Sequence, residues 1–64
     1  MKLRFVLHRD LVACAEQLAD DDTTFVLHKT PYGADKYIRI TGEIKPHTRK
    51  YLDRMAQAGY VTIR

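Results

Sequence analysis

The apolar residues of this chain switch between two periods, and that switching constrains its fold more than any other feature. Side chains of a strand point to opposite faces in turn, so a run of alternating apolar residues predicts a strand. A helix repeats about every 3.6 residues, so apolar residues at spacings of three and four predict an amphipathic helix. Runs of the first kind occupy residues 2–8, 23–30, 36–41 and 61–64, and runs of the second kind occupy residues 10–20 and 46–58.

The resulting order of elements, β-α-β-β-α-β, predicts an α+β fold. Residues 31–35 have the Pro and Gly chemistry of a turn, so the runs on either side of them are expected to form a hairpin. We expect a ferredoxin-like fold, an antiparallel sheet of four strands with both helices on one face. Residues 1–64 form one small domain, because 64 residues leave no room for a second core.

Particular residues mark the ends of the two helices. Asp10 offers an N-cap for the first helix, and Pro46 is tolerated in the first turn of the second because its missing N–H would be unbonded there. Gly59 suits the left-handed residue that follows a helix. Tyr60 is then expected to fold back on Met55, as in a Schellman motif.

Charge is distributed unevenly along the chain. Residues 36–64 carry seven Lys and Arg against two acids, a net of +5, whereas residues 1–35 carry four against six, a net of −2. Three of the acids are consecutive, at 20–22, where the partly negative end of the first helix makes them unfavourable. The basic C-terminal half favours an anionic partner, and nucleic acid, DNA above all, is the partner that we expect.

The outer face of the second helix carries the candidate binding residues. His47, Lys50 and Arg54 are spaced by three and four, so they form one stripe on the helix. Such a face can lie along phosphates or enter a major groove, where basic side chains also read bases. An alternative is an ordinary solvated face, on which Arg49 pairs with Asp53. The nucleic-acid-binding residues that we expect are Lys45, His47, Arg49, Lys50, Arg54 and Arg39.

Residues 41–63 contain a further pattern, T-x-x-Y-L-x-x-M-x-x-x-G-Y-V, formed by Thr48, Tyr51, Leu52, Met55, Gly59, Tyr60 and Val61. This pattern resembles the recognition helix and first wing strand of winged-helix DNA-binding domains. The resemblance implies DNA binding by exposed residues around Thr48, and it makes a winged helix the alternative fold. That family has a helix immediately upstream, whereas residues 36–41 alternate as a strand does.

The face of the predicted sheet without helices is a second candidate surface. Basic and aromatic residues on such a face can hold single-stranded nucleic acid, although Tyr37 is its one strong stacking residue. The same face could instead bind a protein or pair with itself in a homodimer. The residues expected there are Arg4, Val6, His8, Thr24, Val26, His28, Tyr37, Arg39, Thr41, Thr62 and Arg64.

The sequence offers little for catalysis, metal binding or membrane insertion. Cys14, the one cysteine, cannot form an internal disulfide, which fits a cytoplasmic protein. The three histidines lack ligand spacing, so we expect no metal and no cofactor. No apolar run approaches the roughly 20 residues that span a bilayer. A chain this short can scarcely form the concave site that most enzymes need, so we expect a non-enzymatic protein.

These observations lead to one main hypothesis and two alternatives. The main hypothesis is a nucleic-acid-binding regulator that uses its basic C-terminal helix. The first alternative is an inhibitor or adaptor of the kind that phages and plasmids encode, which docks on a larger host defence or transcription complex. The second is a toxin–antitoxin component or dimeric repressor in which the sheet forms the dimer.

Overall fold

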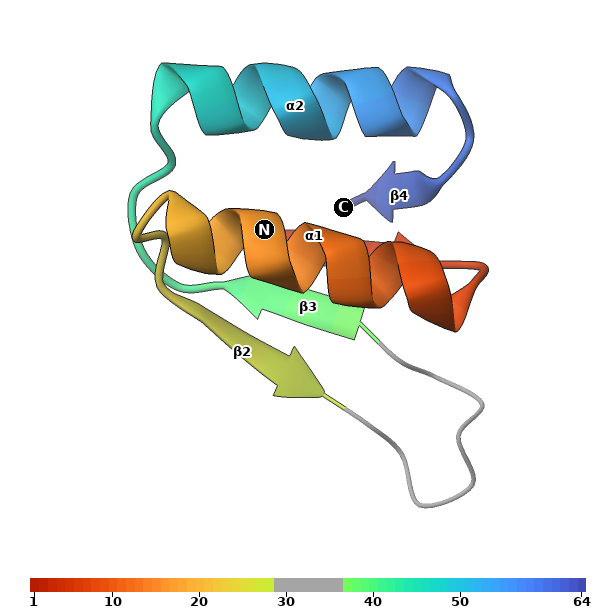
Figure 1. The fold of residues 1–64 in the computed structure, drawn as a ribbon, viewed down its shortest axis with the longest axis horizontal. Coiled ribbons are helices and arrows are strands. Elements are labelled where there is room, and N and C mark those ends of the chain that lie inside the picture. The colour runs from red at the N-terminus through yellow and green to blue at the C-terminus, as the bar shows by residue number, and fades with distance from the viewer. Residues whose placement is uncertain (29–36) are drawn as a thin grey trace.

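A computed structural model describes residues 1–28 and 37–64 and confirms the predicted order of elements (Figure 1). The turn expected at 31–35 lies outside the described residues. The six elements are β1 (Lys2–Phe5), α1 (His8–Asp20), β2 (Phe25–His28), β3 (Tyr37–Ile40), α2 (Pro46–Gln57) and β4 (Val61–Ile63).

The four strands form one antiparallel sheet in the order β2-β3-β1-β4, so the prediction of a four-stranded antiparallel sheet is confirmed. The chain passes from β1 through α1 to β2 and then returns to place β3 between them. Leu3 stands opposite Ile38 of β3 on one side and opposite Ile63 of β4 on the other. The two chain ends therefore lie side by side (Figure 1), and the Lys2 N–H donates to the Arg64 carbonyl over 2.8 Å.

The core lies between one face of the sheet and the two helices. Residues that are directly opposite each other on adjacent strands point to the same face of the sheet, so Leu3 and Ile38 share one face. Buried side chains of both helices join Leu3 and Ile38 in one core cluster. The buried apolar residues are Leu3, Leu11, Cys14, Leu18, Ile38, Ile40, Leu52 and Val61.

The end of α2 matches the prediction in detail. The helix begins at Pro46 and is followed by Gly59, whose φ of +85° lies in the left-handed region that favours glycine. The Tyr60 N–H donates to the Met55 carbonyl over 3.0 Å, and the Gly59 N–H donates to the Ala56 carbonyl over 3.1 Å. These two bonds define the Schellman motif.

The beginning of α1 differs from the prediction. The helix starts at His8 rather than after Asp10, and no side chain caps it. The Leu7 carbonyl accepts the N–H groups of Asp10 and Leu11, over 3.2 and 3.3 Å, so the first turn forms before the predicted cap. Since β1 ends at Phe5, Val6 and His8 leave the sheet instead of extending it as predicted.

The winged-helix alternative is not the fold of this chain. The segment Tyr37–Ile40 is strand β3, and it pairs with β1 on one side and with β2 on the other. Ile38 and Ile40 are buried on the helix side of the sheet while Arg39 is exposed, which is the alternation of a strand. The place where a winged helix would have its upstream helix is thus occupied by a central strand.

Candidate nucleic-acid interface

Three cationic residues stand side by side across the open face of the sheet. Lys2 of β1 is directly opposite Arg39 of β3. On the other side, Lys2 and Arg64 exchange two backbone hydrogen bonds of 2.8 Å, so Arg64, which follows β4, is its direct neighbour. Adjacent strands are about 4.8 Å apart, so the backbone positions of the three residues lie within about 10 Å of one another. We call Arg39, Lys2 and Arg64 the basic row.

The sequence places the basic row on this face through strand alternation. The neighbours of these residues along the chain, Leu3, Ile38 and Ile63, contribute to the helix side of the sheet, so the cationic side chains point the other way. Like charges that are directly opposite in a sheet repel and destabilise it. The repulsion within the basic row therefore opposes the stability of the isolated fold, and an anionic partner would relieve it.

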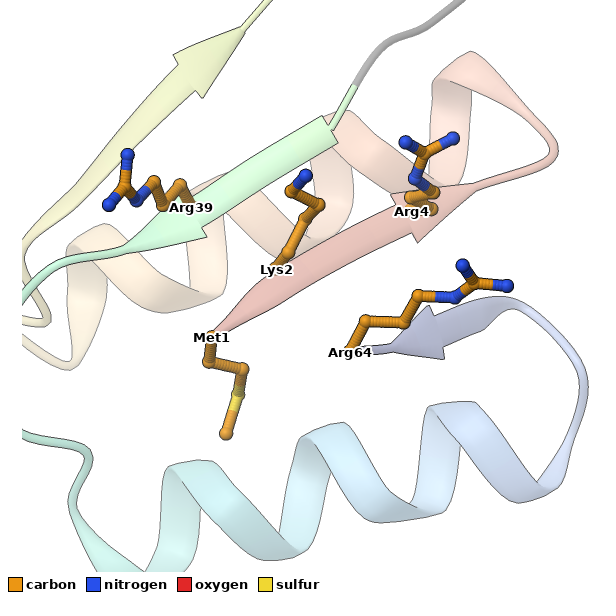
Figure 2. A pocket seen from close by; sticks show the side chains of 5 residues that line it. All are labelled: Met1, Lys2, Arg4, Arg39 and Arg64. Atoms are coloured by element: carbon orange, nitrogen blue, oxygen red, sulfur yellow. The ribbon is translucent and has the colours of Figure 1, made fainter.

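A shallow depression of about 320 Å³ lies over the basic row (Figure 2). Arg4 and Met1 line it together with the three residues of the row. Figure 2 shows the four cationic side chains rising from neighbouring strands on one face. The lining residues that the structure describes thus include four cations and no acid.

Tyr37 connects the basic face to β2. Its ring stacks on the His28 ring with centroids 4.5 Å apart and an angle of 11° between the planes. The Lys2 Nζ lies 4.8 Å from the Tyr37 centroid and the Arg4 guanidinium carbon 5.9 Å from it, both within cation–π range. Because β3 lies between β2 and β1, the tyrosine has the histidine on one side and the cations on the other. The Tyr37 ring thus helps to orient the side chains of Lys2 and Arg4.

The basic residues expected at the start of α2 have a partner in Asp21, the residue that follows α1. The Lys45 Nζ donates to the Asp21 carbonyl over 2.7 Å, and the His47 Nε2 lies 3.3 Å from an Asp21 carboxylate oxygen. The Thr48 hydroxyl, fully buried, donates to the other carboxylate oxygen over 2.7 Å. We call Asp21, Lys45, His47 and Thr48 the Asp21 cluster. Thr48, which the winged-helix resemblance places at a DNA contact, instead joins two helices of the domain.

The charge of Asp21 suits its place at the start of α2. Hydrogen bonds from Thr48, first, and from Gln17 lower the pKa of the Asp21 carboxyl, with a smaller contribution from His47 and with desolvation opposing the shift. Thr48 is the third residue of α2, so the carboxylate sits beside the positive end of that helix. Asp21 is therefore unfavourable for the partly negative end of α1 but favourable for the partly positive start of α2.

The remaining candidates on α2 lie on a surface separate from the basic row. The Arg49 Nε donates to an Asp53 carboxylate oxygen over 3.1 Å, the pair that the solvated-face alternative expects. Lys50 and Arg54 are exposed on the same helix. Because α2 packs on the helix side of the sheet, the structure does not bring Arg39 together with these residues. The six candidate residues are thus divided between two faces.

The open face holds most of the residues expected there. Val26 stands opposite Arg39, His28 opposite Tyr37, and Arg4 opposite Thr62. The Thr41 N–H donates to the Thr24 carbonyl over 3.1 Å just beyond the strands. Sequence reasoning omitted Lys2 from this face, although the alternation of residues 2–8 put it beside Arg4. Its position between two arginines depends on strand register, which no local pattern reveals.

The described residues give little support for other kinds of site. Within 1–28 and 37–64, no group of three or more His, Cys, Asp or Glu residues is placed to hold a metal ion. Burial raises the pKa of the Cys14 thiol to about 11, so it remains protonated at neutral pH. Neither α1 nor α2, the helices of the described part, has the length and apolar character to cross a membrane.

No protein-family model matches this sequence, and no curated protein or solved structure gives a significant match to the chain. The case for a function therefore rests on the geometry of the basic row and of the surfaces around it.

Proposed function

We propose that this protein binds the phosphate backbone of nucleic acid on the open face of its sheet, without catalysing a reaction. The observation that carries the proposal is the basic row: Arg39, Lys2 and Arg64 are direct neighbours across the sheet, and none of the described residues that line the depression over them is acidic. Arginine and lysine donors on a rigid sheet match phosphate oxygens, and phosphate contacts supply most of the affinity of sequence-independent binding.

The proposal moves the principal contact from α2 to the sheet. Arg49 pairs with Asp53, and Lys45 and His47 contact Asp21, so these three residues have partners within the domain. Binding to phosphate would have to compete with those contacts. The cations of the basic row repel one another instead, so an anion bound among them gains from each. Lys50 and Arg54 are exposed on α2, on the other side of the sheet from the basic row, so they are not part of the proposed contact.

Phosphate contacts carry no sequence information by themselves. Tyr37 also has neighbours on both sides, so a base would have to displace Lys2 or Arg4 to stack on that ring. The role that follows is therefore to cover or hold nucleic acid and to regulate the access of other proteins to it, rather than to read a base sequence.

The test is equilibrium binding of labelled single-stranded and duplex DNA and of single-stranded RNA at salt concentrations from about 50 to 200 mM. For each neutralised phosphate, we expect log affinity to fall with log salt at a slope near −0.9 for duplex DNA and about −0.7 for single strands. The double substitution Arg39→Ala with Arg64→Ala should weaken binding and make the slope shallower by about 2, because it removes two phosphate contacts.

The matched control is the double substitution Lys50→Ala with Arg54→Ala, which removes the same charge from α2. It should leave the slope nearly unchanged. If the α2 variant loses affinity and the sheet variant does not, the helix is the contact surface and our proposal is wrong. If no nucleic acid binds the wild-type protein at 50 mM salt, the proposal fails altogether.

A further inference from the structure

A second surface lies on the opposite side of the sheet from the basic row, at the end of α2. Tyr51, Arg54, Met55, Ala58 and Tyr60 line a depression of about 370 Å³, which we call the α2 pocket. The first four are spaced by three and four along the helix, so they form one stripe. Tyr60, beyond the helix, is folded back against that stripe by the Schellman motif and is 49% exposed.

The α2 pocket combines apolar walls with a cation. Two phenol rings, a thioether and a methyl group form most of its lining, and Arg54 adds the only formal charge among the five lining residues. Tyr and Arg are the residue types that dominate binding energy in protein interfaces, and Met adapts its shape to different partners. The pocket thus has the composition of a protein-binding site rather than of an average surface.

Electrostatics favours an acidic partner at this pocket. Lys50 lies one helical turn before Arg54, and the nearby Asp53 carboxylate accepts a hydrogen bond from Arg49. The end of a helix is normally partly negative, but here the carbonyls of Arg54, Met55 and Ala56 already accept hydrogen bonds from the N–H groups after them. Those accepted bonds reduce the repulsion that the helix end would exert on an approaching carboxylate.

We propose that the α2 pocket binds an acidic protein segment, which inserts one apolar side chain between Tyr51 and Tyr60 and places a carboxylate on Arg54. The bidentate geometry of guanidinium and carboxylate would fix the segment, and the buried apolar side chain would supply most of the affinity. A nucleobase fits less well, since its polar edge would find few partners on these apolar walls. The proposal does not depend on nucleic-acid binding, because the α2 pocket and the basic row share no residue.

The probe is a random peptide library displayed on phage and selected against the full-length protein. We expect the enriched peptides to share an aliphatic or aromatic residue flanked by Asp or Glu. For a synthetic peptide of the enriched sequence, Arg54→Glu should lower affinity by about tenfold or more, since it replaces attraction by repulsion. Tyr60→Ala should weaken binding similarly, whereas Tyr60→Phe, which keeps the ring, should bind as the wild type does.

Controls separate this proposal from the nucleic-acid one. The substitution Arg39→Ala should leave peptide affinity unchanged, and Tyr60→Ala should leave nucleic-acid affinity unchanged. The proposal is overturned if the enriched peptides have no acidic bias, or if Arg54→Glu binds them as the wild type does. It is also overturned if Tyr60→Ala abolishes a concentration-dependent dimer, since a second copy would then be the occupant, or if Tyr60→Ala weakens nucleic-acid binding as strongly as Arg39→Ala does.

Discussion

The Asp21 cluster and the basic row both gather charged residues from distant parts of the chain, but they do so with opposite consequences. In the Asp21 cluster, the carboxylate accepts from the Thr48 hydroxyl and lies beside the His47 ring, and the Asp21 carbonyl accepts from the Lys45 ammonium group, so each polar group has a partner. In the basic row, Lys2 lies between two arginines on neighbouring strands. The comparison shows that a cationic residue is a stronger candidate for binding an anion when the fold has not already paired it with an acidic group.

The largest effect that we expect is the loss of thermal stability in Asp21→Ala. The substitution leaves the buried Thr48 hydroxyl without its acceptor and removes the negative charge from the start of α2. The midpoint of thermal unfolding should fall by about 5 °C or more, as for the loss of a helix cap in a domain of this size. Circular dichroism measures the unfolding, and nucleic-acid affinity below the midpoint should not change.

Two variants sharpen that prediction. Asp21→Asn keeps an oxygen acceptor for Thr48 but loses the charge, so its midpoint should lie between those of the wild type and Asp21→Ala. Asp20→Ala removes a neighbouring acid that has no role in the Asp21 cluster, and it should not destabilise the protein. If the unfolding midpoint falls equally in Asp20→Ala, the overall charge at the end of α1 sets the stability, and the contact of Asp21 with Thr48 does not.

The dependence of stability on pH tests the same carboxylate. The pKa of Asp21 is lower in the folded protein than its ordinary value of 3.8, so the unfolded chain takes up this proton first as pH falls. The stabilisation by the ionised group is therefore fully present above about pH 5 and decreases as pH falls through 3.8 and below. Urea unfolding from pH 7 to pH 3 measures the free energy of unfolding. The difference in this free energy between the wild type and Asp21→Asn should become smaller in that acidic range. A gap that stays constant to pH 3 would contradict the shifted pKa.

These contrasts also show what could be read from the sequence. The order of elements, the antiparallel sheet and the Schellman end of α2 follow from local patterns, because period and turn chemistry act over a few residues. The Asp21 cluster joins residues 27 positions apart, and the triple acid at 20–22 gives no local sign of its partner. The basic row depends on register across three strands. Sequence reasoning therefore found the basic helix more easily than the basic sheet face, whose residues 2, 39 and 64 are widely separated.

A smaller effect is expected at Tyr37, which holds the cations of the open face. The substitution Tyr37→Leu removes both the stack with His28 and the cation–π contacts with Lys2 and Arg4. An exposed cation–π contact is worth about 0.5–1 kcal/mol, and losing this preorganisation of Lys2 and Arg4 should lower the affinity for nucleic acid by no more than about two- to fivefold. The salt slope should stay the same, because the number of phosphate contacts is unchanged. Tyr37→Phe keeps the ring and should bind as the wild type does; a loss there would point to the hydroxyl instead.

The smallest effect concerns the repulsion within the basic row itself. In Arg39→Gln, the cation opposite Lys2 is gone, so the free protein should become more stable by about 0.2–1 kcal/mol at low salt, even though it binds nucleic acid less well. High salt screens exposed charges, so the gain should vanish near 1 M salt, where the Debye length is about 3 Å. Arg49→Gln provides the opposite case, because it removes the attraction to Asp53 and should lower stability by a few tenths of a kcal/mol. Urea unfolding of both variants at two salt concentrations measures these changes. If Arg39→Gln is destabilising at low salt, the arginine contributes to the fold, and the contrast between the two charged regions does not hold.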